Sequence, residues 1–114
     1  MALFYDHKIR PGDVIMYADG LSNKAHTAIV LEYDSQEIFM LFLTSNPYWN
    51  HNCRPIMTDE LAYFNFGTRN EKLTYLAPVV RPTAHVAKVN GGFPKERVEE
   101  FLEEFPRECA QVSS

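Results

Sequence analysis

The chain has 114 residues, 46% of them hydrophobic and 13% aromatic, which is typical of one globular domain and excludes a disordered chain. The formal net charge of −4 argues against a general nucleic-acid binder, but residues 1–95 hold nine basic and nine acidic side chains, so a basic patch on the body is compatible with it. No apolar run approaches the ~20 residues that span a bilayer, and the first residues lack the apolar core of a signal peptide, so we expect a cytoplasmic protein without membrane contact.

Strands dominate the first half of the chain. Pro11-Gly12-Asp13 is a turn sequence, and residues 14–17 follow it as a short apolar strand. A second strand is predicted over 27–33, whose AIVL centre is typical of a strand covered on both faces. A third strand at 38–44 is close enough to the second to form an antiparallel hairpin with it.

The second half is more mixed. Residues 46–55 form a loop long enough to be functional. Thr58, followed by two acidic residues, predicts an N-cap and a short helix over about 59–64. A fourth strand is predicted over 74–81, with Pro78 placing it at an edge or a bulge, and residues 82–92 are expected to be irregular.

A C-terminal helix is predicted over about 94–105, beginning at Pro94 and followed by a flexible tail at 106–114. One apolar stripe at helical spacing faces the body: Val98, Phe101, Leu102 and Phe105. The glutamates of the other face are expected to be solvated: Glu96, Glu99, Glu100, Glu103 and Glu104. The whole chain is therefore predicted to be a single, mainly β domain, a small antiparallel barrel with a short middle helix and a C-terminal helix.

Several stretches resemble, in this order, the MazF/PemK family of toxins. PGDVIMY resembles the family's opening strand, HTAIVLE its second strand and FLTSN its Thr-Ser-Gln strand end, while TYLAPVVRP and GGFPKERVEEFLEEF resemble its ending in a helix. The resemblance covers most of residues 11–105. It implies an SH3-like barrel, usually a homodimer, that cleaves single-stranded RNA without a metal and is silenced by an antitoxin peptide.

The resemblance also implies site residues. In the family, an Arg before the Pro of the second strand stabilises the scissile phosphate, and His26 and Thr27 occupy these two positions here. Thr44 and Ser45 match the family's Thr-Ser, and Arg81 matches the Arg that follows the family's Gln-Val, while Pro78 replaces the Asp of that motif. The implied catalytic residues are thus His26, Thr44, Ser45 and Arg81. Because the family's Arg is replaced here, a second expectation is a protein that has the same barrel but no longer cleaves RNA.

The chemistry of RNA cleavage fits these residue types. Cleavage without a metal needs a base for the 2′-hydroxyl, an acid for the leaving oxygen and stabilisation of the phosphorane. Histidine, with a pKa near ~6.5, suits the proton transfers, and Arg binds phosphate through paired N–H groups. We expect His26 to act as acid or base, Thr44 and Ser45 to contact the phosphate, and Arg54 or Arg81 to clamp it.

Further residues are expected to bind the substrate, two of them aromatic side chains on which bases stack: Asn46, Tyr48, Trp49, Arg54 and Lys24. His51 and Cys53 are two potential metal ligands without a partner pair, so neither a metal nor another cofactor is expected. Cys53 and Cys109 lie far apart in the sequence and are expected as thiols.

A non-catalytic SH3-like binding module or inhibitor protein is the alternative. CcdB-type toxins share the barrel and act by binding a protein, so the fold alone does not separate the two functions. The 46–55 loop and the acidic helix would then face the protein partner. The expected partner is therefore single-stranded RNA or a protein, either antitoxin-like or a host target.

Overall fold

The strands of the protein are rich in β-branched and aromatic residues, which favour extended backbone. The computed structural model describes residues 9–19, 24–45, 52–63, 75–82 and 86–112. The long strands are β1 (Asp13–Asp19), β2 (Lys24–Tyr33), β3 (Glu37–Thr44), β5 (Tyr75–Pro82) and β6 (Val86–Gly92). The shorter elements are β4 (Arg54–Pro55), α1 (Thr58–Leu61), α2 (Lys95–Glu104), the 3-10 helix η4 (Arg107–Cys109) and β7 (Gln111–Val112).

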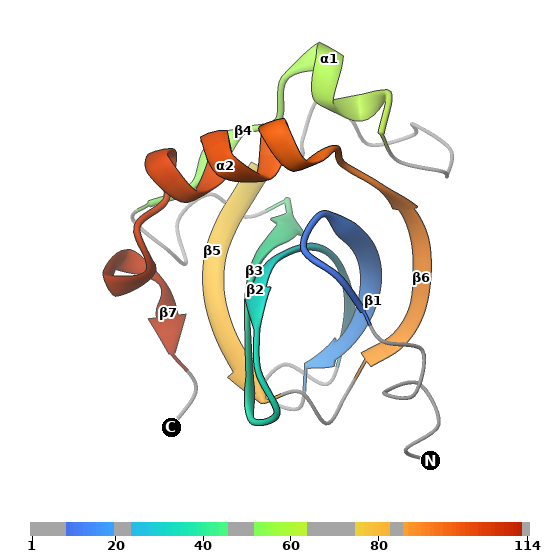
Figure 1. Ribbon diagram of the computed structural model, residues 1–114, viewed down its shortest axis with the longest axis vertical. Coiled ribbons are helices and arrows are strands. Elements are labelled where there is room, and N and C mark those ends of the chain that lie inside the picture. The colour runs from blue at the N-terminus through green and yellow to red at the C-terminus, as the bar shows by residue number, and fades with distance from the viewer. Residues whose placement is uncertain (1–8, 20–23, 46–51, 64–74, 83–85, 113–114) are drawn as a thin grey trace.

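All of these strands belong to one curled sheet. Its order is β4-β5-β3-β2-β1-β6, and β7 lies beside β5 (Figure 1). Every pair is antiparallel except β5 and β7, which run parallel. The result is a small half-barrel with two helices, which confirms the predicted mainly β fold and the predicted β2–β3 hairpin.

Alternation along the strands builds a hydrophobic core on each face of the sheet. The helix-side core packs under α2 and contains Val14, Ile29, Leu31, Phe39, Leu41, Leu76, Val80, Phe93, Val98, Phe101 and Phe105. The opposite core contains Ile9, Ile15, Tyr17, Ala28, Val30, Ile38, Met40, Phe42, Ala77 and Val79. Ala28 to Leu31 alternate between the two and are all buried, so the prediction that β2 is covered on both faces is confirmed.

Helix α2 lies across the open side of the half-barrel, between β5 and β6 (Figure 1). Its apolar stripe is confirmed, because Val98, Phe101 and Phe105 are buried and Leu102 packs against them. Pro94 is the N-cap rather than the first helical residue, since its backbone is extended. No helix in the described ranges is long and apolar enough to cross a membrane.

Two sequence predictions differ from the structure at element boundaries. Residues 86–92 were expected to be irregular, which is wrong, because β6 pairs with β1 through two register shifts. Helix α1 runs from Thr58 to Leu61, so it starts one residue earlier than predicted and ends before residue 64, with Met57 as its N-cap. In the tail, for which flexibility was expected, η4 and β7 return the chain to the sheet, and Arg107 binds Glu37 at 2.9 Å.

Candidate nucleic-acid site and ion-pair pocket

Polar side chains line up across the sheet at one end of its central strands. Tyr17 of β1 pairs with His26 of β2, and Thr44 of β3 pairs with Tyr75 of β5. The β2–β3 register pairs Ala28 with Phe42, so His26 and Thr44 each lie two residues beyond this pair, towards the same end of the sheet. Because side chains alternate along a strand, these residues share the face of the opposite core.

Phe42 is the centre of this face. The His26 ring is stacked on the Phe42 ring, with centroids 4.5 Å apart and planes 10° from parallel. The guanidinium carbon of Arg81 lies 5.4 Å from the same centroid, within cation–π range. Both groups therefore contact one phenyl ring from different strands, whereas Thr44 lies six residues along β3 from Ile38, the residue that pairs with Arg81.

On the side away from Phe42, Arg81 is bound by Gln111 of strand β7. It is only 3% exposed, and its Nη1 donates to the Gln111 carbonyl oxygen at 3.0 Å. Its Nη2 donates to the side-chain oxygen of Gln111, and Nη1 also reaches the carbonyl of Val80. The guanidinium therefore lies between Phe42 and strand β7.

The structure shows less about the remaining residues predicted for this site. Ser45 is exposed directly after β3, and Lys24 lies in β2, where its backbone is opposite that of Asp19 in β1. Asn46, Tyr48 and Trp49 lie outside the described residues, and so does His51. Of the two thiols, Cys53 packs against the opposite core and Cys109 is exposed.

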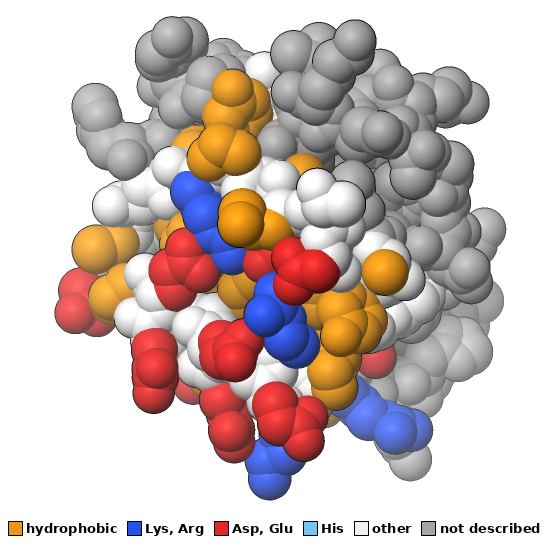
Figure 2. Space-filling model, turned by 90° about the horizontal axis from the view of Figure 1, so that it is seen from above, with side chains coloured by type: hydrophobic (Ala, Val, Ile, Leu, Met, Phe, Trp, Pro, Cys, Tyr) orange, Lys and Arg blue, Asp and Glu red, His pale blue; other side chains and the backbone are white. Residues whose placement is uncertain are grey.

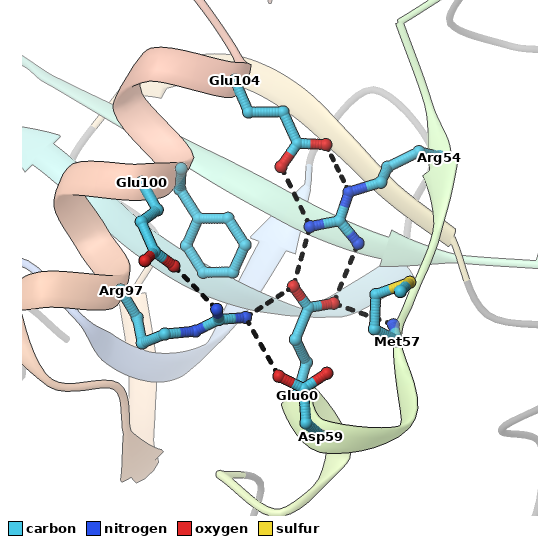
Figure 3. A pocket seen from close by; sticks show the side chains of 8 residues that line it. Arg54, Met57, Asp59, Glu60, Arg97, Glu100 and Glu104 are labelled. Carbon is cyan, nitrogen blue, oxygen red and sulfur yellow. Dashed lines mark hydrogen bonds and ion pairs between the residues drawn. The ribbon is translucent and has the colours of Figure 1, made fainter.

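Arg54 lies in a different place, on the side of α2. Its Nη1 and Nη2 donate to the two oxygens of Glu60 at 2.9 and 2.7 Å, and its Nε and Nη2 donate to Glu104 (Figure 3). These hydrogen bonds, that to Glu60 above all, raise the pKa of Arg54 above its usual value despite its partial burial. The guanidinium predicted as a phosphate clamp is thus occupied by carboxylates.

Glu60 joins two arginines in a shallow cavity of about 400 Å³ between α1, β4 and α2. It is 1% exposed and accepts hydrogen bonds from Arg54, from Arg97 at 2.9 Å and from the backbone N–H of Met57 at 2.8 Å (Figure 3). Burial by itself raises the pKa of Glu60, but the hydrogen bonds and the two positive charges outweigh it and hold the pKa below its usual value. The sequence showed only an acidic residue in a first helical turn and gave no sign of Arg97 as its partner.

The rim of this cavity is acidic. Asp59, Glu100 and Glu104 line it, and Arg97 pairs with Glu100 at 2.7 Å. Figure 2 shows Asp and Glu side chains gathered around Lys and Arg side chains on this surface. The glutamates of α2, predicted to be solvated, are exposed as expected, but two of them also bind arginines.

The two regions differ in what they can do chemically. The Phe42 face carries an imidazole and a guanidinium on one phenyl ring, groups that can move a proton and bind a phosphate. The ion-pair pocket, the cavity lined by Arg54, Glu60 and Arg97, joins β4, α1 and α2 through charges that are already paired with one another. Comparison with protein-family models, curated proteins and solved structures finds no match to this chain.

Proposed function

We propose that the chain is a metal-independent endoribonuclease of the MazF/PemK type that cleaves single-stranded RNA at the end of the sheet where His26 of β2 and Thr44 of β3 lie. The observation that carries the proposal is the contact of His26 and Arg81 with the phenyl ring of Phe42, two residues before Thr44 in the same strand. His26, Thr44 and Arg81 are three of the four residues that the resemblance implies as catalytic.

Each residue has a role that its chemistry allows. His26 is half-buried, so its imidazole can exchange protons with a bound nucleotide as acid or base. Thr44 is half-buried near the end of β3 and Ser45 is exposed directly after it, where their hydroxyls can bond a phosphate oxygen. Arg81 supplies the positive charge that stabilises the phosphorane, once its contact with Gln111 is exchanged for the phosphate.

RNA cleavage by this site is expected to need no metal. A long single-stranded RNA incubated with the wild-type protein in EDTA yields discrete fragments, because no metal takes part. Since a general acid or base contributes roughly 100-fold or more to such a reaction, His26→Ala lowers the cleavage rate by about that factor, and Thr44→Ala lowers it as well. Gel electrophoresis of end-labelled RNA measures both rates.

Thr27 supplies the matched control. It follows His26 in the same strand and is half-buried, but its hydroxyl is directed at the Met16 sulfur, 3.4 Å away. Thr27→Ala is expected to cleave at the wild-type rate. Wild-type rates in both His26→Ala and Thr44→Ala would overturn the assignment of the site.

A non-catalytic binding module is the second candidate, favoured by the state of Arg54. That arginine is saturated by Glu60 and Glu104, and the surrounding acidic surface repels RNA. A folded protein that cleaves no RNA but retains one host protein in a pull-down at physiological salt would favour this function.

The resemblance also implies a homodimer. Sedimentation equilibrium would measure the mass of the protein in solution and so test this expectation.

A further inference from the structure

The two cysteines of the chain are far apart in the sequence but approach each other in the structure. Cys53 directly precedes β4, whose first residue pairs with Leu76 of β5. Cys109 ends η4 and lies two residues before the first residue of β7, which pairs with Val79 of β5. Because β4 runs antiparallel to β5 and β7 runs parallel to it, the residues that precede these two short strands lead towards the same stretch of β5.

A hydrogen bond shows that the two segments are in contact. The side-chain N–H of Asn52 donates to the backbone carbonyl oxygen of Cys109 at 2.8 Å. Asn52 is the neighbour of Cys53 in the chain, so this bond joins a residue next to one cysteine to the other cysteine itself. It is independent of the strand pairing, and both observations bring the two cysteines to the same part of the molecule.

The two thiols differ in exposure. Cys109 is exposed, whereas Cys53 is half-buried and packs against the opposite core. Thiols react with disulfides as thiolates, and access to the reagent decides which of two thiols reacts first. An accessible cysteine beside a second one that can resolve its first product is typical of reversible thiol oxidation in proteins.

We propose that Cys53 and Cys109 form a reversible disulfide that fixes the C-terminal segment, residues 107–112, on the sheet. The oxidant is a small-molecule disulfide such as glutathione disulfide. The Cys109 thiolate attacks one sulfur of the oxidant and releases one thiolate, and the Cys53 thiolate then attacks the Cys109 sulfur and releases the second. The protein thus loses two protons and two electrons, and the oxidant is reduced to two thiols.

The C-terminal segment can adjust to the geometry of a disulfide, in which the two Cα atoms lie roughly 4.4–6.8 Å apart. Among its described residues, Gln111 and Val112 pair with β5, and strand contacts of this length are marginal. The segment can therefore shift towards Cys53 as the bond forms. In a reducing compartment the pair stays as thiols, and the disulfide forms transiently under oxidising conditions.

The disulfide acts on Arg81 through Gln111. Gln111 follows Cys109 by two residues and accepts hydrogen bonds from Arg81 through its carbonyl and its side chain. The proposed RNA cleavage, on which this consequence rests, requires Arg81 to exchange Gln111 for a phosphate. A segment fixed by the disulfide keeps Gln111 in place, so oxidation is expected to slow cleavage and reduction to restore it.

The test oxidises the full chain with glutathione disulfide and caps the remaining thiols with iodoacetamide. Intact-mass spectrometry then separates the internal disulfide from capped thiols and from glutathione adducts. Cys109→Ser removes the pair at an exposed position. The matched control adds Ser35→Cys to Cys109→Ser, which keeps two thiols but moves one to the exposed turn between β2 and β3.

We expect the wild type to form the internal disulfide about tenfold faster than this control or more, because the fold holds its two thiols at a high effective concentration. The oxidised wild type is expected to unfold at a higher urea concentration than the reduced protein, since the bond restricts the unfolded chain. The Gln111 amide is expected to exchange its hydrogen more slowly after oxidation. Cys109→Ser is expected to show neither change.

Glutathione adducts or disulfide-linked dimers in place of the internal bond would overturn the proposal, and so would equal rates in the wild type and the control. Unchanged hydrogen exchange at Gln111 would overturn the fixing of the C-terminal segment. Equal cleavage of RNA by the oxidised and the reduced protein would overturn the effect on Arg81. Because the disulfide is measured without RNA, a protein that forms it and cleaves RNA in neither state contradicts the proposed function alone.

Discussion

Glu60 and Arg81 are the two charged side chains that are buried among the described residues. They are stabilised in different ways, since Glu60 lies between two arginines while Arg81 contacts a phenyl ring and a glutamine. Removing one partner of a buried ion pair costs roughly 3–5 kcal/mol, because the other charge stays buried without compensation. Glu60 is therefore the residue at which charge and stability are most closely linked.

The pH dependence of stability follows from Glu60. Its pKa in the folded state lies below the usual 4.5, so folding favours the ionised carboxylate. The resulting stabilisation is complete above about pH 4.5 and is lost as the pH falls through the lower folded-state pKa. Glu60→Gln is expected to unfold at lower urea concentration than the wild type at pH 7, and the gap narrows towards pH 3.

Urea unfolding followed by circular dichroism at pH 7, 5 and 3 measures this gap. Glu99→Gln is the control, because Glu99 is an exposed glutamate of α2 and its loss is expected to leave stability unchanged. A gap between wild type and Glu60→Gln that stays constant over this pH range would contradict the assignment of the linkage to Glu60.

Residue types in the sequence indicate which reactions the chain could carry out, but not where the residues lie. No spacing in the sequence places His26, Thr44 and Arg81 on one face of the sheet, whereas the strand register does. Arg54 was expected beside them and instead binds Glu104, 50 residues away. Such a long-range pair leaves no periodic signal in one sequence, whereas the apolar stripe of α2 does.

At the scale of elements, the start of β1 depends on Gly12. Its φ of 98° lies in the left-handed region, and its N–H donates to Val30 while its carbonyl accepts from Phe93. A Cβ at this position would come within 2.4 Å of the Phe93 carbonyl oxygen. Gly12 thus ties β1 to β2 and to the segment that leads into α2.

Substituting this glycine is expected to be costly. Gly12→Ala combines a strained φ with a backbone clash, so we expect a loss of about 1–3 kcal/mol or more in the free energy of unfolding. Gly92→Ala is the matched control, since the nearest atom to its added Cβ is 3.6 Å away and its φ is not positive. Thermal unfolding of both variants measures the difference, and equal losses would contradict this account of Gly12.

Elements whose own sequence favours them were predicted, and those that depend on a distant partner were not. The β2–β3 hairpin has two continuous apolar runs joined by a short turn, and both strands were found. Strand β6 ends in Asn90-Gly91-Gly92 and pairs with β1 irregularly, so only tertiary pairing with a strand far along the chain makes it extended. Strands β4 and β7 are too short for any periodic pattern.

At the scale of the whole molecule, α2 and the sheet share one core. A helix of ten residues is marginal in isolation, so packing rather than intrinsic propensity keeps α2 folded. Val98, Phe101 and Phe105 contribute to the same helix-side core as β1, β2, β3 and β5. Every central strand alternates between this core and the opposite one, so the two cores are joined through the strands themselves.

The helix and the sheet are therefore expected to unfold together. Phe101 is 1% exposed and contacts both Phe93 and Phe105, so Phe101→Ala is expected to cost about 3–5 kcal/mol of unfolding free energy. Leu102→Ala, at a half-buried position of the same helix, is expected to cost less. In each variant, the urea transitions measured by circular dichroism at 222 nm and by aromatic fluorescence should coincide. If Phe101→Ala instead lost the helical signal in a separate, earlier transition, α2 would unfold independently of the sheet, and the half-barrel would be stable without it.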